Sequence, residues 1–311
     1  MYDKPLLSIC IPTNGVIEWV FPVLDSIYKQ NIDEKLFEVI ITDNGNNLEF
    51  KKEIKIYIEK YSNIVYAETK AVLFLNEIEA YNLAKGELIK FLNHRSILAD
   101  GSIKKLIEYI KVNMDEKPIT YFANGVLKID KCMHNFNNFN DFVKNLSYFS
   151  SWSSGMAIWN TDYKRILKNI HYFNELFPHT SILFAESKRN LYVIDNTVIF
   201  KDLPQGKKPK GKYDLYWAFG VEYPGIIFDL LRNKSISIKT HNFVLKENLK
   251  FLADLFLDYN IRKRYSSYDL KGFKNIFIIF YNKKEFAYIL LIRIFIRIKN
   301  KIATCCNNFI K

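Results

Sequence analysis

The sequence of 311 residues predicts an α/β protein with a mostly parallel sheet flanked by helices, followed by a helical, basic C-terminal extension. Three observations support this prediction. Short apolar runs alternate with segments of helical spacing, polar turns close these runs, and the pattern becomes almost wholly helical from about residue 215. Such alternation is typical of parallel strands that are buried on both faces. A composition of 49% hydrophobic and 25% charged residues is that of a globular protein, so disordered and collagen-like chains are excluded.

The first 113 residues supply four predicted strands and four predicted helices. We place the strands at 6–11, 37–42, 64–67 and 88–92, and the helices at 16–30, 48–61, 75–85 and 100–113. Three polar segments follow strands, namely Pro12-Thr13-Asn14, Asp43-Asn44-Gly45 and Asn93-His94-Arg95-Ser96. Ligands of open parallel sheets bind beyond the carboxyl ends of the strands, so these segments form the predicted site.

The regular alternation of strands and helices ends at about residue 118. Strand-like pieces at 119–122, 156–159, 192–194 and 198–200 are mixed with helices near 160–169 and 179–189. We expect an Asn- and Phe-rich loop at 134–140 and a basic loop at 205–212.

Basic charge is concentrated near the C-terminal end. The net charge is +12, and residues 261–311 hold twelve basic and two acidic residues, so nearly all of the excess belongs to this segment. A nucleic-acid-binding protein more often spreads its charge over a folded face, which argues against nucleic acid as a partner. Basic residues among apolar ones favour a membrane-surface segment instead.

The cysteines and the N-terminal segment bear on the compartment. No metal-ligand spacing relates the four cysteines, so we expect reduced thiols in a reducing compartment. The chain leads directly into a predicted strand without the pattern of a signal peptide, so we expect a cytoplasmic protein. The cysteines are Cys10, Cys132, Cys305 and Cys306.

The strand ends resemble those of family 2 glycosyltransferases, which have the GT-A fold. The segment 7–14 is similar to their opening strand with its Pro-Thr-Tyr-Asn turn, and 39–45 is similar to their strand that runs into Asp-Asp/Asn-Gly/Ser. The segment 84–92 is similar to their Ala-x-Gly-Glu-Tyr-Ile-x-Phe-Leu strand. The resemblance implies a GT-A domain at 1–214, with a nucleotide-binding half (1–105) and an acceptor half (106–214), before a helical region at 215–311.

The resemblance also implies a nucleotide-sugar donor, with UDP as the expected nucleotide. Pro12 and Thr13 would flank the base, and Asp43 would accept a hydrogen bond from it, since a carboxylate suits the N3–H of uracil. A capping or turn role is the alternative for Asp43. The expected donor-site residues are Pro12, Thr13, Asn14, Asp43, Asn44, His94, Arg95, Lys207 and Lys208.

One departure from the family follows the fourth strand. The family places an Asp-rich triplet there, which holds a divalent metal on the diphosphate, whereas this chain has His94, Arg95 and Ser96. A charged arginine is not a metal ligand, so we expect no metal cofactor. Arg95 would bind the diphosphate, and the lysines of 207–212 would close over it. Two alternatives stay open: a site without activity, and a displaced Mg²⁺ or Mn²⁺ held by His94, His179 and Glu175.

A second departure concerns the catalytic base. The family supplies it from a Glu-Asp pair that opens a helix, and here His179 falls at the Asp position after Pro178, similar to abequosyltransferase-like members. Histidine suits a general base, with a reference pKa near ~6.5. Glu175 is the second candidate for the catalytic base, and Glu186 is a weaker one. The alternative for His179 is a structural role, in which its ring packs at the start of the helix.

The segment Trp152-Ser153-Ser154 lies where family members place an acceptor-side loop. By this resemblance, Trp152 would stack on a sugar face and the serine hydroxyls would bind sugar hydroxyls. A tryptophan in the hydrophobic core is the alternative.

The tail at 273–304 mixes apolar runs with single cations. Arg293, Arg297 and Lys301 are spaced by four and share one helix face, and no apolar run reaches the ~20 residues that span a membrane. We expect a basic helix on an anionic membrane surface, peripheral on its inner face, or else a helix packed on a neighbouring subunit.

These features predict an inverting glycosyltransferase of the hexosyltransferase type. It would move a sugar from a nucleotide diphosphate to a saccharide or lipid-linked saccharide in the synthesis of surface polysaccharide or lipooligosaccharide. The alternative is a non-catalytic GT-A protein that binds nucleotide or glycan, or acts as a scaffold. The oligomeric state stays open.

Overall fold

The computed structural model describes residues 4–129, 131–170, 172–204 and 211–309, and residues 303–309 by their backbone alone. The chain forms two compact units. The first comprises Met1–Phe142 and Phe149–Pro204, and the second comprises Val143–Tyr148 and Gln205–Lys311.

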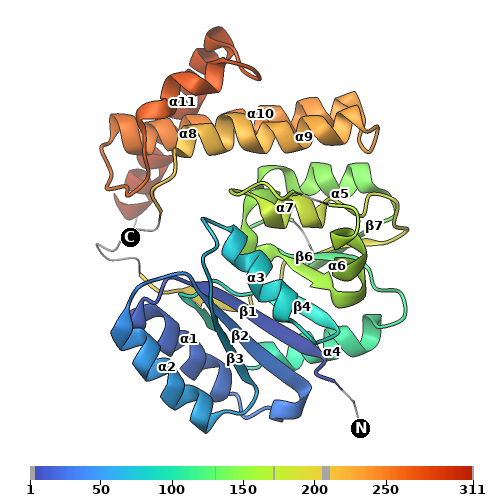
Figure 1. Ribbon diagram of the computed structural model, residues 1–311. Helices are drawn as coiled ribbons and strands as arrows, with labels where there is room; N and C mark the ends of the chain where they lie inside the picture. Colours follow the sequence, from blue (N-terminus) through green and yellow to red (C-terminus); the bar gives the residue numbers. More distant parts are fainter. Residues whose placement is uncertain (1–3, 130, 171, 205–210, 310–311) are drawn as a thin grey trace. The chain divides into compact units, whose positions relative to one another are not determined.

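The first unit contains a five-stranded sheet in the order β3-β2-β1-β4-β8 (Figure 1). Its members are β1 (Leu7–Thr13), β2 (Phe37–Asp43), β3 (Ile64–Glu68), β4 (Leu88–Phe91) and β8 (Ala157–Trp159). The pairs β1–β2, β2–β3 and β1–β4 are parallel, and β8 is antiparallel to β4. Strands β1, β2 and β4 are almost completely buried, which is why they appear in the sequence as apolar runs with few polar interruptions.

Four helices accompany this sheet, as the sequence predicted. They are α1 (Ile17–Tyr28), α2 (Leu48–Lys60), α3 (Leu75–Leu83) and α4 (Ser102–Asn113). The rings of Phe21 on α1 and Phe50 on α2 lie 5.7 Å apart, so these helices pack side by side, and α3 packs on β1 and β2 (Figure 1). The side chain of Asn47 starts α2 by accepting hydrogen bonds from the backbone N–H groups of Glu49 and Phe50.

The rest of the first unit holds two smaller sheets. One has the order β6-β9-β7, and the other pairs β10 with β5. The strands are β5 (Ser96–Leu98), β6 (Ile119–Phe122), β7 (Met133–Phe136), β9 (Tyr192–Asp195) and β10 (Phe200–Asp202), and the helices are α6 (Asn160–Leu167) and α7 (Pro178–Leu183). Helix α5 (Phe139–Leu146) belongs to the first unit as far as Phe142 and to the second unit from Val143 on. The short strand predicted at 198–200 is displaced, since β10 begins only at Phe200.

Two local predictions are wrong. The expected loop at 134–140 instead contains β7, which pairs antiparallel with β9, and the start of α5. Side chains of β7 alternate between exposed and half-buried, so this strand lacks the apolar run on which the sequence prediction depended. The helix expected to reach about residue 189 ends at Leu183, and Glu186 therefore lies beyond it.

The second unit is helical, as predicted for the chain beyond residue 215. Its core gathers Tyr216, Leu249, Leu252, Ile276 and Phe286. Its elements are α8 (Leu215–Trp217), η4 (Ala218–Glu222), α9 (Tyr223–Arg232), α10 (Ile238–Phe256), η5 (Leu257–Ile261), η6 (Lys271–Phe277) and α11 (Lys283–Phe309). Within the described ranges, none of the helices has the length and apolar character needed to cross a membrane.

Candidate functional site

The carboxyl ends of β1, β2 and β4 bring three of the predicted site residues together. Thr13 lies opposite Asp43 in the β1–β2 register, and Thr13 Oγ1 is 2.9 Å from Nδ1 of His94. Thr13 Oγ1 also accepts the backbone N–H of Gly15 at 3.1 Å. Asn76 of α3 fixes this edge, since its Nδ2 donates to the carbonyl oxygen of Thr13 at 3.2 Å and to that of Thr42 at 2.9 Å.

Asp43 is held tightly at the end of β2. Its Oδ1 accepts the backbone N–H of Gly45 at 2.8 Å, its Oδ2 accepts the hydroxyl of Tyr66 at 3.1 Å, and only 1% of the residue is exposed. Burial raises the pKa of Asp43 above its ordinary value, while both hydrogen bonds oppose this effect. The turn that follows requires glycine, because a Cβ on Gly45 would lie 2.1 Å from the carbonyl oxygen of Asn14.

A short loop closes over this edge. Asn44 Nδ2 donates to the carbonyl oxygen of Ala71 at 2.9 Å, and the backbone N–H of Thr69 donates to that of Asp43 at 2.8 Å. Residues 69–74, which follow β3, are therefore tied to the end of β2.

His94 is neutral over most of the pH range. Burial and the adjacent guanidinium of Arg95 lower the pKa of His94 to about 4. Thr13 Oγ1 and Nδ1 of His94 share one hydrogen bond, in addition to the one that Oγ1 accepts from the backbone N–H of Gly15. The edge of Trp19 packs against the imidazole with the ring centroids 5.0 Å apart.

The guanidinium of Arg95 binds the last residue of β10 and the residue after it. It donates to Oδ2 of Asp202 at 3.1 Å and to the carbonyl oxygen of Leu203 at 3.3 Å. Asp202 also accepts the hydroxyl of Ser96 at 2.6 Å. The residues at this position do not fit a divalent cation, because Arg95 is itself a cation and Nδ1 of His94 is occupied by Thr13. Across the described ranges, no three His, Cys, Asp or Glu side chains gather as metal ligands.

His179 forms a buried contact with Glu77 of α3. Its Nδ1 lies 2.8 Å from Glu77 Oε1, its backbone N–H donates to the same oxygen at 3.2 Å, and its Nε2 lies 2.9 Å from the carbonyl oxygen of Ser151. A carbonyl oxygen can only accept, so Nε2 carries a hydrogen. Both ring nitrogens are thus occupied, which leaves no free lone pair on His179 to receive a proton from a substrate.

Glu175 lies four residues before His179, in the segment that leads into α7. It is half-buried, and its carbonyl oxygen accepts the backbone N–H of Phe74 at 3.1 Å. No hydrogen bond or ion pair of its carboxylate is found among the described residues. Glu175 therefore lies beside the 69–74 loop, and within the described residues its carboxylate is available to bind a substrate.

A buried lysine, Lys90, holds the end of the segment Trp152–Ser154 in place. Lys90 Nζ donates to the carbonyl oxygens of Ser154 at 2.6 Å, Phe91 at 2.8 Å and Met156 at 3.3 Å. Burial lowers the pKa of Lys90 to about 7. Ser153 and Ser154 are buried in this structure, and Trp152 packs on Phe200 with the ring centroids 5.7 Å apart.

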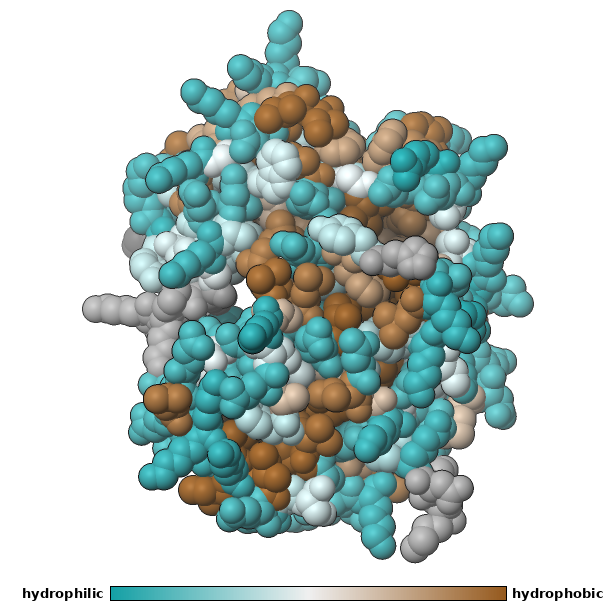
Figure 2. All heavy atoms as spheres, in the orientation of Figure 1, coloured by the Kyte–Doolittle hydropathy of each residue, from teal (hydrophilic) through white to brown (hydrophobic). Residues whose placement is uncertain are grey.

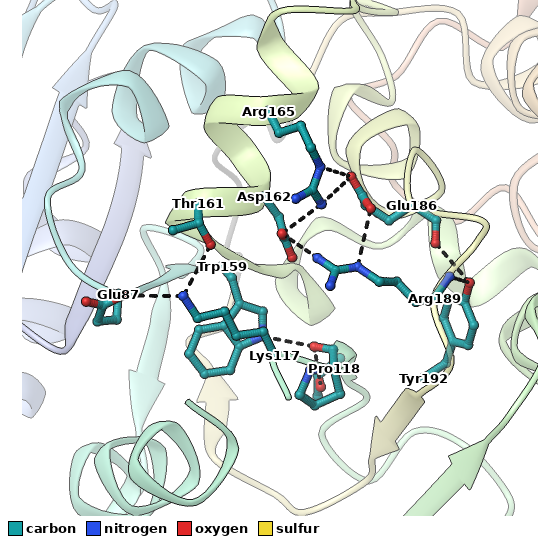
Figure 3. Close-up of polar contacts among 11 residues, drawn as sticks. Glu87, Lys117, Pro118, Trp159, Thr161, Asp162, Arg165, Glu186, Arg189 and Tyr192 are labelled. Carbon is teal, nitrogen blue, oxygen red and sulfur yellow. Dashed lines mark hydrogen bonds and ion pairs between the residues drawn. The ribbon is translucent and has the colours of Figure 1, made fainter. Parts of the chain in front are cut away.

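Glu186 belongs to an ion-pair network (Figure 3). Its carboxylate binds Arg165 at 2.8 Å and Arg189 at 3.3 Å, and both arginines also contact the buried Asp162. The hydroxyl of Tyr192 donates to the carbonyl oxygen of Glu186 at 2.9 Å. These contacts tie the chain after α7 to α6 and β9.

Several partners of the site are absent from the sequence prediction. Tyr66, Asn76, Glu77, Lys90 and Asp202 each hold a predicted site residue or its loop. Four of them lie outside the three motifs, and Lys90 occupies a position of the 84–92 motif at which the family has no fixed residue. The lysines Lys207 and Lys208 of the predicted donor site lie outside the described residues.

Comparison with known proteins gives one sequence relative. No protein-family model matches the chain. A stretch of 117 residues is 28% identical to Uncharacterized glycosyltransferase MG025 of Mycoplasma genitalium, and it covers 37% of this chain and 39% of that protein. The match thus spans about two fifths of the relative's length.

Solved structures of TarS from S. aureus share the fold. TarS 1-349 in complex with UDP-GlcNAc matches with a TM-score of 0.57 and 14% identity, over 87% of this chain and 79% of that one. The complex with UDP matches with a TM-score of 0.57 and 15% identity, over 84% and 75%. The chain thus has the GT-A-like fold that its sequence predicted, a mostly parallel sheet flanked by helices.

Proposed function

We propose that this protein is a glycosyltransferase that uses a nucleotide-sugar donor, with UDP as the nucleotide. The observation that carries the proposal is the meeting of Thr13, Asp43 and His94 at one edge of the parallel sheet. The GT-A-like fold, the structures of TarS with UDP and UDP-GlcNAc, and the glycosyltransferase relative support it. The resemblance of the strand ends to family 2, with the abequosyltransferase-like variant of its motifs, supports the same class.

In this proposal Asp43 receives the N3–H of the base. Each carboxylate oxygen accepts one hydrogen bond in this structure and retains capacity for another. However, the residue is buried, so the base reaches it only after the 69–74 loop and its tie to Asn44 have shifted. Pro12, Thr13 and Asn14 would then border the nucleotide.

Arg95 would stabilise the diphosphate in place of a metal. A guanidinium has five N–H donors, and two contacts to Asp202 and Leu203 leave donors for a phosphate oxygen. Charge that develops on the leaving diphosphate then meets a fixed cation, which is the common way to lower such a barrier.

Glu175 is the base that the geometry favours. It would take the proton of the acceptor hydroxyl, whose oxygen bonds the anomeric carbon while the bond to the diphosphate breaks, with inversion at that carbon. The nucleoside diphosphate leaves, and the proton stays on Glu175. His179 then has a positioning role, since its contacts with Glu77 and Ser151 anchor the start of α7. Trp152 and the serines beside it border the acceptor, a saccharide or lipid-linked saccharide.

Release of UDP from UDP-sugars, with and without saccharide acceptors, tests this assignment. Glu175→Gln should lower kcat by about 10²–10⁴-fold with UDP affinity unchanged, the typical effect of removing a general base. Glu116→Gln, an exposed glutamate after α4, is the matched control and should leave kcat unchanged. An equal kcat for Glu175→Gln and wild type would contradict the role of Glu175. Binding of UDP without any transfer or hydrolysis would favour a non-catalytic nucleotide-binding protein.

A further inference from the structure

The C-terminal helix α11 has its polarity reversed relative to an ordinary surface helix. Phe286 and Ile289 face the core of the second unit near its start, but further along the inward face consists of arginines. Arg293 contacts Asp254, and Arg297 contacts Asp254 at 2.8 Å and Asp258 at 2.7 Å. The two aspartates belong to α10 and η5, so these ion pairs fix the rotation of α11.

The opposite face of α11 is apolar and exposed. Leu291 is 66% exposed and Phe295 is 68% exposed. Their neighbours at helical spacing extend the same face over about four turns, roughly 21 Å at a rise of 1.5 Å per residue. The outer apolar face, as we call it, consists of Tyr288, Leu291, Phe295, Ile298 and Ile302. A water-exposed helix normally buries its apolar stripe and exposes its charges, so this arrangement needs an apolar medium outside.

The apolar surface continues beside α11. A groove of about 340 Å³ lies between η5 and α11. Four apolar side chains and three basic ones line it, namely Leu257, Ile261, Ile294, Ile298, Arg262, Arg297 and Lys301. In the space-filling view, brown hydrophobic side chains reach the surface of the helical unit at the top of the picture, next to teal hydrophilic ones (Figure 2).

Lysines flank the outer apolar face at both ends. Lys283 and Lys284 lie at the start of α11, and Lys299 and Lys301 lie near the end of its described side chains. No ion-pair partner of these four lysines is found within the described ranges, and the one acidic residue of the helix is Glu285. The arginines, by contrast, are neutralised within the unit. The charge available to a partner is therefore positive and sits around an apolar face.

From this geometry we infer that the outer apolar face of α11 lies in the interface of an anionic phospholipid bilayer. Apolar side chains would enter the boundary between headgroups and acyl chains, and the flexible lysine stems would reach the phosphates. A second copy of this chain is the less suitable occupant, because the flanking lysines would face one another in a symmetric contact. The inference does not depend on the reaction proposed above.

Cosedimentation of the full-length protein with vesicles tests it. We expect at least tenfold tighter binding to phosphatidylglycerol vesicles than to phosphatidylcholine vesicles. The double variant Leu291→Glu/Phe295→Glu should bind phosphatidylglycerol at least tenfold more weakly. Val112→Glu is the matched control, because Val112 is 83% exposed on α4, and it should bind as the wild type does. Lys299→Gln and Lys301→Gln should each weaken binding roughly fivefold.

Circular dichroism of each variant shows whether it is folded. The inference would be wrong if the folded Leu291→Glu/Phe295→Glu variant still bound phosphatidylglycerol vesicles as tightly as the wild type. It would also be wrong if the wild type bound both kinds of vesicle equally. It would likewise be wrong if the wild type bound neither vesicle and formed a dimer in sedimentation velocity, with the double variant a monomer, because the face would then cover a second copy.

Discussion

Lys90 should make folding stability depend on pH in the alkaline range. Its ammonium is buried and contacts only carbonyl oxygens among hydrogen-bond partners, and burial lowers its pKa from 10.5 to about 7. Between pH 7 and 10 the unfolded chain binds a proton that the folded chain lacks, so stability rises with pH. The two pKa values give a gain of about 3.5 kcal/mol over this interval. This is an upper limit, because the three carbonyl contacts favour the charged form.

Urea unfolding of the wild type and of Lys90→Met at pH 7, 8.5 and 10 measures this effect. Methionine has a similar length and does not titrate, so the variant should show a slope smaller by up to about 3.5 kcal/mol over the interval. Tyrosines whose pKa is raised in the folded state lower the folding stability only above about pH 10. They are present in both proteins, so they do not affect the comparison. Identical slopes for the two proteins would refute the assignment of this dependence to Lys90.

Three further predictions concern the sheet edge. His94 has a folded-state pKa of about 4 against an ordinary value of 6.5, so its contribution to stability should fall by up to about 3 kcal/mol as the pH drops through this interval, and His94→Asn should remove that part of the acid dependence in urea titrations. Gly45→Ala should destabilise the protein by about 2–3 kcal/mol, because its Cβ would meet the carbonyl oxygen of Asn14, whereas Gly225→Ala in α9 meets nothing and should stabilise it by roughly 0.5–1 kcal/mol in thermal unfolding. Transfer should survive EDTA, Arg95→Ala should cost on the order of 10²-fold in kcat, and Arg95→Lys should recover only part of it; activity lost with EDTA and restored by Mn²⁺ would point to a displaced metal instead.

The central sheet could be predicted because its strands are buried on both faces. The segments 7–13, 37–43 and 88–91 carry almost unbroken apolar runs, and a polar turn follows each of them. Strand β7 lacks this signal, since it pairs through its backbone while half of its side chains face solvent. The early end of α7 was also missed, because no glycine or proline follows Leu183 before Leu191.

The meeting of the strand ends was predictable, but the side-chain contacts around them were not. Parallel strands align their carboxyl ends, so Thr13, Asp43 and His94 could be expected to meet. Their partners come from far along the chain. Asn76 is 63 residues from Thr13, Glu77 is 102 residues from His179, and Asp202 is 107 residues from Arg95. Local periodicity carries no information on such contacts. They change the expected chemistry, because they occupy both nitrogens of His179 and pair Arg95 with a carboxylate.

Calorimetric titration of UDP into the full-length protein and its Asp43→Asn variant measures whether Asp43 binds the base of the nucleotide. Asparagine keeps an oxygen for the N–H of Gly45, so the fold should persist, but its amide would place a donor against the N3–H of the base. Asp33→Asn is the matched control, since Asp33 is an exposed residue that caps η1 (Glu34–Leu36) with its side chain and asparagine can cap equally well. We predict that the wild type and Asp33→Asn bind UDP alike and that Asp43→Asn binds at least tenfold more weakly. Equal affinity in a folded Asp43→Asn protein, or no binding of UDP by the wild type, would contradict a UDP-sugar site at this edge of the sheet.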